Sequence, residues 1–338
     1  MRHLAYLLTV LLCASGSSAP QARPARTQRS AQAPQRVQLA PRFVPGTVLR
    51  YQTEFRTATE GHPTGLVEDP QAPSKLELTW GAVVRIEVLP AASDAAGVGG
   101  RTRLRTTYEK SAATARSDTF DPEGADLQEQ YRKLEGRTIE FAVDAQGNVS
   151  EVKVLQQVPA DEQAASAARE WLGRLTTGAS LPQGGIVPGQ QWSSEQPAAS
   201  APLAGLIWRT ESTYLRDERC WPFEGPGAPA AGDAPAVEMC AVILTRFEVK
   251  QPRARRDPTP EDYRRRGLRT AGKWGGSGES LSYVSLHTGF VVSITQSSTE
   301  EMNVTVSTTD GESRVRYVGR VRSQSQITLL PDSPPASR

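Results

Sequence analysis

The sequence predicts a mainly β protein with a few helices (α+β class). We expect two related, curved, antiparallel half-barrel-like sheets of long strands, each packed against helix. Three observations predict this fold: long segments alternate apolar and polar residues, a strand-turn-strand pattern occurs twice, and a similar turn precedes each occurrence. Alternation with a period of two is typical of strands that bury one face.

The clearest strand-turn-strand pattern is a hairpin from Thr138 to Leu155. Ile139, Phe141 and Val143 alternate with polar or small residues, and a polar tetrapeptide ending at Gly147 follows them. A glycine that closes a polar turn between two apolar runs is typical of a β-hairpin. The pattern therefore predicts two paired strands with one buried face.

A second hairpin of this kind is predicted with its turn glycine at Gly289. Each hairpin is preceded by a Val-Pro-Gly entry turn, at Pro45 in one case and at Pro188 in the other. The two prolines lie 143 positions apart, and Gly147 and Gly289 lie 142 apart. These matched offsets predict a β-rich half that is built twice.

Two further segments have the alternation of unusually long strands. Residues Leu76 to Val88 are apolar at every even position. In the segment Ser313 to Leu330, one face is predicted to be apolar and the other to carry arginine and glutamine. At about 3.3 Å per residue these strands are near 40 Å long, which favours a broad, curved sheet. The predicted apolar row of the second segment is Val315, Tyr317, Gly319, Val321, Ile327 and Leu329.

Three helices are predicted between the strands. Asp121 to Gly136 has leucine and tyrosine at helical spacing, and Pro159 to Thr176 has an apolar face that includes Trp171. A short third helix is expected after Thr259, which would be its N-cap, and Gly267 would end it.

The N-terminus has the pattern of an export signal. Arg2 and His3 precede a short apolar run that ends at Cys13, and small residues follow. We expect a signal peptide over residues 1–20, a disordered linker over 21–41, β-rich halves over 42–178 and 179–330, and a disordered tail over 331–338. The protein would then lie in the periplasm or at the cell surface. Lipid anchoring through Cys13 is the alternative.

Removal of that signal leaves two cysteines, Cys220 and Cys240, which are 20 residues apart across a loop rich in proline, glycine and alanine. In an oxidising compartment this even pair predicts a disulfide. A metal site is disfavoured because neither cysteine has a histidine or second cysteine at ligand spacing.

The balance of charge disfavours nucleic acid as a partner. Lysine and arginine total 39 and aspartate and glutamate 37, a formal net charge of +2. Beyond the signal, no apolar run is long enough to span a bilayer, so no transmembrane span is expected in the mature chain.

Local arginine clusters are the remaining electrostatic feature. Arg264, Arg265 and Arg266 are a candidate anion contact, and the alternative is that they complement the C-terminal dipole of the short helix. We interpret the Arg314 to Arg322 stripe as the solvated face of its strand.

We find no catalytic constellation, no metal site and no need for a cofactor. His62 and His287 are the histidines left after signal removal, and the common hydrolase motifs are missing from the sequence. A phosphate-loop spacing at Gly267 to Lys273 ends in Trp274 where a hydroxyl residue is required. The glycines that follow, through Gly278, are interpreted as a flexible or bulged strand start.

The doubled layout and two short motifs, Pro188 to Trp192 and Gly276 to Gly289, resemble an exported bacterial protein family of unknown function. More distantly, the chain resembles the periplasmic lipoprotein carriers of lipoprotein-localisation-factor-like fold. The resemblance covers about residues 42 to 330. It implies a curved sheet that folds round helices and holds acyl chains on its concave side, and it brings no catalytic residues.

These observations predict an exported, non-catalytic binding protein that holds a lipid, acyl chain or other hydrophobic ligand in an open β groove. The alternative is a cell-envelope structural or interaction module that binds protein or polysaccharide and has no small-molecule ligand. The candidate groove residues are Trp80, Tyr108, Phe141, Trp171, Phe247 and Tyr283.

Overall fold

The computed structural model describes eleven stretches of the chain. Residues Arg36–Arg338 belong to one compact unit, and the unit Met1–Gln35 lies outside the described residues. The predicted signal peptide, the predicted helix Pro159 to Thr176 and the C-terminal tail also lie outside them. The described stretches are 36–65, 75–90, 101–118, 128–129, 131–143, 149–154, 181–182, 184–197, 203–220, 238–251 and 257–330.

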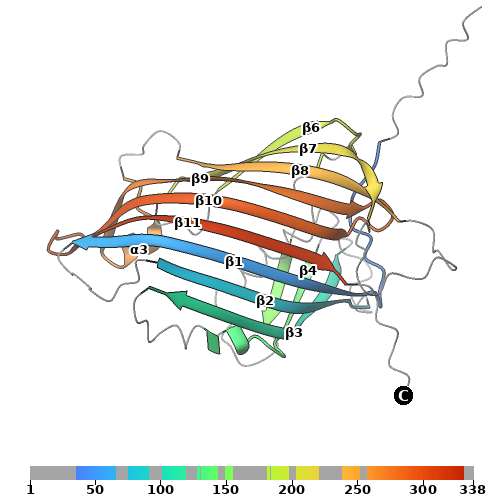
Figure 1. The fold of residues 1–338 in the computed structure, drawn as a ribbon, viewed down its shortest axis with the longest axis horizontal. Helices are drawn as coiled ribbons and strands as arrows, with labels where there is room; N and C mark the ends of the chain where they lie inside the picture. Colours follow the sequence, from blue (N-terminus) through green and yellow to red (C-terminus); the bar gives the residue numbers. More distant parts are fainter. Residues whose placement is uncertain are drawn as a thin grey trace, which may run out of the picture. The chain divides into compact units, whose positions relative to one another are not determined.

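Long β-strands make up most of the described chain, which confirms the mainly β class (Figure 1). The longest strands have 18 residues, so each spans about 60 Å. The strands are β1 (Val48–Gly65), β2 (Lys75–Val88), β3 (Thr102–Ser117), β4 (Thr138–Val143), β5 (Val149–Val154), β6 (Gln191–Pro197), β7 (Ile207–Arg219), β8 (Met239–Lys250), β9 (Leu268–Ser285), β10 (Val291–Thr308) and β11 (Arg314–Leu329).

These strands form a single antiparallel sheet in the order β5-β4-β3-β2-β1-β11-β10-β9-β8-β7-β6. The expectation of two separate sheets is therefore corrected. Strand β1 pairs with β11 from Tyr51 opposite Leu329 to Gly65 opposite Val315. Along one edge β1 pairs with β2, and along one edge β11 pairs with β10. The backbone N–H and C=O groups of the remaining edges are satisfied because β1 and β11 pair with each other, which makes one sheet.

The two predicted entry turns have the same local geometry. Gly46 and Gly189 both have a φ of 85°, a value that favours glycine. The amide of Gly46 donates to the carbonyl of Val88, and the amide of Gly189 donates to that of Tyr214. Both turns thus tie the start of a strand to a neighbouring strand. The proposed duplication of the whole half stays a prediction.

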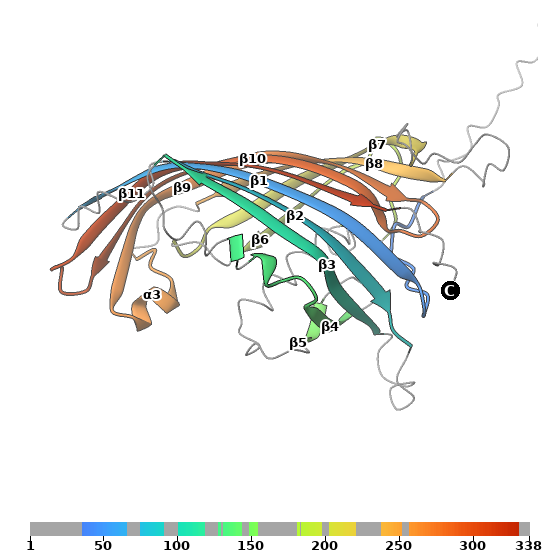
Figure 2. The same cartoon turned by 60° about the horizontal axis from the view of Figure 1, so that its bottom comes forward.

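The sheet is curved, and α3 (Glu261–Arg265) and β4 lie beneath the arch that the long strands form (Figure 2). The segment that contains Leu203 and Leu206 packs with Val249 and Val304, and it lies near α3, since the Ala204 amide donates to the Pro258 carbonyl. We call the concave side the inner face of the sheet, and the opposite face the outer face.

The folded part begins earlier than the sequence indicates. The predicted disordered linker extends to Pro41, yet Leu39 is only 2% exposed and Val37 forms an antiparallel bridge with Ile186. These two apolar side chains pack against the cluster at one end of the inner face. Burial of that apolar surface offsets the entropy of ordering the segment.

The short helix is confirmed, but its predicted N-cap is not. Pro260 occupies the cap position without a side-chain hydrogen bond. The buried Thr259 hydroxyl instead accepts a hydrogen bond from the Thr270 amide at 2.9 Å. Of the predicted helix Asp121 to Gly136, the structure describes helical residues at 128–129 and 131–132.

Candidate functional site: the inner face of the sheet

A large apolar cluster lies at one end of the inner face. Tyr51, Val88 and Tyr214 are at most 2% exposed there, and Phe141 is 3% exposed. The Tyr51 hydroxyl donates to the carbonyl of Val291 at 3.0 Å, and burial raises the pKa of this phenol. We call these residues the first cluster. The first cluster contains side chains from β1, β2 and β4 and from β7 and β10. It therefore connects strands that lie on both sides of the β1–β11 pair.

A smaller apolar cluster lies at the other end. Leu203 and Leu206, each 1% exposed, precede β7 and pack with Val249 and Val304. Trp208, Trp274, Met302 and Val306 are partly buried against them. Both ends of the inner face are therefore covered by apolar packing.

Small polar side chains lie between the two clusters. Pairing of β11, β10 and β9 places Ser325, Gln296 and Ser280 in one row across the sheet. The adjacent inner row consists of Ser323, Ser298 and Gly278. We call these six residues the central belt. Its five side chains are half-buried.

Several polar groups of the central belt have no hydrogen-bond partner in the part of the chain that the structure describes. Among the described residues, the side chains of Ser280, Gln296, Ser298 and Ser325 form no hydrogen bond with another protein group. The Ser323 hydroxyl lies 3.4 Å from that of Thr57. A hydroxyl or amide that has no protein partner remains able to bond to water or to a ligand.

Apolar side chains stand on both sides of the central belt. Phe55 and Trp80 are paired on β1 and β2 next to Ser325, and Leu78 lies in the adjacent inner row. On the other side Phe247 and Trp208 pack with ring centroids 5.5 Å apart. The inner face is thus amphipathic, with hydroxyl and amide groups between aromatic walls.

Four of the predicted groove residues share this inner face. Strand register places Trp80, Tyr108, Phe141 and Phe247 on it. Phe141 is part of the first cluster, whereas the other three side chains are only partly buried. Trp171 lies outside the described residues.

Trp80 and Tyr108 are held by local contacts. The indole Nε1 of Trp80 donates to the Ser111 hydroxyl at 3.0 Å, and its ring lies 5.6 Å from that of Tyr131. Burial raises the pKa of Tyr108, so this phenol stays neutral at neutral pH. Both residues therefore present neutral aromatic surface on the inner face.

Phe247 depends on the glycine opposite it. A Cβ on Gly278 would lie 2.3 Å from Cζ of Phe247 and 2.3 Å from the carbonyl oxygen of Ser297. Gly278 lies within the continuous strand β9, so the prediction of a flexible or bulged strand start is corrected here. The glycine allows the Phe247 ring to approach β9 closely.

Tyr283 lies on the outer face, unlike the other described candidates. It pairs with Val242 and packs against the buried group of Cys220, Cys240 and Val292. The predicted disulfide between Cys220 and Cys240 is confirmed. Alternation along a strand shows which residues share a face, but not which of the two faces is concave.

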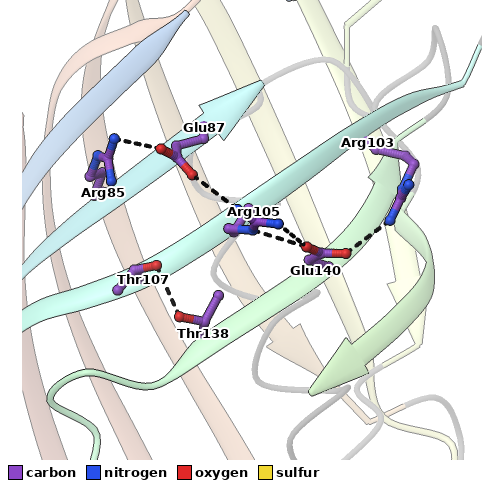
Figure 3. Close-up of polar contacts among 7 residues, drawn as sticks. All are labelled: Arg85, Glu87, Arg103, Arg105, Thr107, Thr138 and Glu140. Carbon is purple, nitrogen blue, oxygen red and sulfur yellow. Dashed lines mark hydrogen bonds and ion pairs between the residues drawn. The ribbon is translucent and has the colours of Figure 1, made fainter. Parts of the chain in front are cut away.

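A charged network holds β2, β3 and β4 together on the outer face (Figure 3). Glu140, 7% exposed, accepts from Arg103 at 2.9 Å and from Arg105 at 2.7 Å. Arg105 also lies 3.7 Å from Glu87, which pairs with Arg85. The hydrogen bond from Arg105 is the main reason that the pKa of Glu140 is lowered. These charges satisfy one another, so the network is structural.

The candidate anion contact at the short helix is largely neutralised. Arg264 pairs with Glu261 and Arg265 pairs with Asp262, one helical turn earlier. Arg266 is the C-cap residue and is exposed. This arrangement agrees with the alternative that basic residues complement the last turn of the helix.

Sequence analysis missed the central belt and part of its walls. Serine and glutamine on β9 and β10 were not recognised as an inner row, and Phe55, Leu78 and Trp208 were not selected. The apolar row of Leu76 to Val88 did contain the signal for Leu78. On β11, Ser323 and Ser325 occupy the two positions of the predicted apolar row between Val321 and Ile327. The belt residues of β9 and β10 had no such signal, because small polar residues are common in loops and on wet faces.

Within the described stretches, no group of three or more histidine, cysteine, aspartate or glutamate side chains has the geometry of a metal site. None of the helices in those stretches has the length and apolar character needed to cross a membrane.

Comparison with known proteins gives no family for this chain. No protein-family model and no curated protein matches it. One solved structure, described as "Asymmetric conductivity of engineered proteins", aligns with 84% of this chain and 100% of its own chain, at 5% identity and a TM-score of 0.19. A similarity this low supports no argument about fold or function.

Proposed function

We propose that this chain is an exported, non-catalytic binding protein that holds a lipid, acyl chain or other hydrophobic ligand on the inner face of its sheet. The observation that carries this proposal is the central belt, where half-buried side chains lie between apolar walls. A ligand with an apolar body and a few polar groups matches that surface, because aromatic walls contact the body and free hydroxyls bond to the polar groups.

The distribution of charge supports an uncharged ligand body. Among the described inner-face positions of β9, β10 and β11, Glu300 is the one carboxylate, and none is arginine or lysine. Glu300 accepts a hydrogen bond from Nε1 of Trp274 at 3.2 Å. A surface of this kind would desolvate apolar groups at low cost.

Export rests on two features. The N-terminal residues have the order of a signal peptide, and the Cys220 to Cys240 disulfide is of the kind that persists in oxidising compartments.

Adjacent residues on opposite faces of β10 provide the test. Ser298 is in the central belt and Ser297 is on the outer face. Ser298→Asp places a carboxylate where the ligand would lie, so we expect the affinity for a fluorescent fatty acid to fall at least 10-fold, roughly the effect of desolvating a charge. Ser297→Asp should leave the affinity within about 2-fold.

The experiment measures saturable binding of the fluorescent fatty acid to delipidated protein, and circular dichroism confirms that both variants are folded. Equal loss in the two variants, or no saturable binding to the original protein, would contradict the proposal.

A further inference from the structure

The outer face has a cluster of arginines where β9, β10 and β11 lie furthest from the first cluster. Strand pairing places Arg269 and Arg314 on either side of Ser307 in one row. Arg316 lies two residues further along β11, opposite Thr305. All three arginine side chains are exposed.

These arginines differ from Arg320 and Arg322, which lie further along the same face of β11. Arg320 pairs with Glu301 at 2.6 Å, and Arg322 lies 3.9 Å from Glu60. Among the described residues, Arg269 and Arg314 have no acidic group within ion-pair distance. The arginines of the predicted stripe are all exposed, as expected for a solvated face. Within the described stretches, Arg320 and Arg322 lie within ion-pair distance of a carboxylate, whereas Arg269 and Arg314 do not, although the charge of Arg269 contributes to the lowered pKa of Asp257.

Arg316 is oriented by a neutral partner. Its Nε donates to Oδ1 of Asn303 at 2.9 Å. This bond uses one N–H of the guanidinium and leaves the remaining donors and the full positive charge for another group.

The three arginines line a pocket of about 830 Å³, together with Asn303, Thr305 and Ser307. Asp257 is the one acidic residue among its lining residues. The Asp257 carboxylate accepts a hydrogen bond from the Thr259 amide at 2.9 Å. Hydrogen bonding to Thr259 is the main reason that the pKa of Asp257 is lowered. With three arginines against one carboxylate, the pocket carries an excess of positive charge.

The geometry suits a tetrahedral oxyanion. Adjacent strands are about 4.8 Å apart, so the Cα atoms of Arg269 and Arg314 lie about 10 Å apart with Ser307 between them. Two arginine side chains can close over that gap from opposite sides. Guanidinium groups donate paired hydrogen bonds that match the oxygens of a phosphate, and the hydroxyls of Ser307 and Thr305 add further donors.

We propose that Arg269, Arg314 and Arg316 form a binding site for a phosphate group, carried by a soluble compound or by a lipid headgroup. The site lies on the outer face, so it is separate from the proposed ligand surface on the inner face. It would allow the protein to bind a phosphorylated molecule while the inner face is occupied.

The first experiment titrates the full chain with inorganic phosphate at constant ionic strength, with chloride as the balancing anion. Arginine Nε–H signals are followed by NMR and assigned from single variants. We expect the signals of Arg269, Arg314 and Arg316 to shift saturably and that of Arg320 to stay unchanged. Arg314→Gln should weaken binding at least 10-fold, about the value of one charge-assisted hydrogen bond.

Arg320→Gln is the matched control, because it removes the same charge from the same strand face and should change the affinity by less than about 2-fold. Absence of saturation, or an equal loss in Arg314→Gln and Arg320→Gln, would overturn the proposal.

A second experiment identifies the source of the phosphate. The chain is sedimented with vesicles of phosphatidylcholine, with or without phosphatidic acid. Binding that needs phosphatidic acid and is lost in Arg314→Gln supports a lipid headgroup. Saturable binding of inorganic phosphate without vesicle binding supports a soluble phosphate compound.

Discussion

The first cluster and the central belt lie on the same face of the same sheet, but they differ in packing. In the first cluster, Phe141 and Tyr214 are almost completely buried. In the central belt, Gln296 and Ser298 are half-buried and their polar groups have no partner among the described residues. The difference indicates that the end of the inner face stabilises the sheet, and it is the basis for the proposal that the middle binds a ligand.

The largest expected effect comes from the first cluster. Phe141→Ala should destabilise the protein by about 3–5 kcal/mol, because it removes a buried ring and leaves a cavity. Urea unfolding followed by circular dichroism measures this change. Protein that remains folded should still bind the fluorescent fatty acid. A destabilisation below about 1 kcal/mol would show that the cluster does not hold the sheet.

Gly278, in the central belt, tests how closely Phe247 packs against β9. Gly278→Ala should cost about 2 kcal/mol, since the added Cβ meets both the Phe247 ring and the Ser297 carbonyl oxygen. Gly275→Ala is the control in the same strand, because its Cβ would lie 4.0 Å from the nearest heavy atom, and it should change stability by about 0.5 kcal/mol or less. Thermal unfolding of both variants gives the comparison. Equal stability would contradict the close contact between Phe247 and β9.

Much of the fold could be predicted from local alternation. The apolar row of β2 and the two faces of β11 follow from a period of two, and the spacing of Cys220 and Cys240 predicted their disulfide. The pairing of β1 with β11 could not be predicted in this way, because it joins residues 250 or more positions apart and leaves no local pattern.

The candidate site was less predictable for two physical reasons. Tyr283 and Val284 both belong to alternating rows, and only the tertiary fold decides that Val284 faces inward. The serines of the central belt have the polarity of exposed positions, so their place on the concave side follows from the curvature of the sheet and not from their own chemistry.

A smaller effect is expected from the outer-face network. Glu140→Gln should cost about 1 kcal/mol at neutral pH, since it weakens hydrogen bonds from Arg103 and Arg105 that are partly exposed. The folded state lowers the pKa of Glu140, so its contribution is present above the unfolded value of about 4.3 and is lost as the pH falls through the folded value.

Urea unfolding of the original protein and of Glu140→Gln from pH 7 to pH 3 measures this contribution. The difference between them should shrink at the acidic end. The control is Glu301→Gln, which breaks the exposed pair with Arg320 and should cost about 0.5 kcal/mol or less. A constant difference across this pH range would contradict the account of Glu140.

The smallest effect on stability is expected in the central belt itself. Ser298→Ala removes a hydroxyl that has no hydrogen-bond partner among the described residues, so the free energy of unfolding should change by less than about 0.5 kcal/mol. If that hydroxyl bonds to the ligand, affinity should fall by about 3- to 10-fold. Fluorescent fatty-acid binding and urea unfolding of one preparation separate the two effects. A large loss of stability would show that Ser298 is structural.

The most direct test of the central claim is native mass spectrometry of protein purified from its own exported fraction, compared with the denatured mass. The account predicts a species that loses a discrete adduct of a few hundred daltons on denaturation, as expected for a bound lipid or acyl compound. Adduct loss from the original protein and not from Ser298→Asp would place that ligand on the central belt. Identical native and denatured masses, in protein with an intact disulfide, would contradict a ligand held on the inner face.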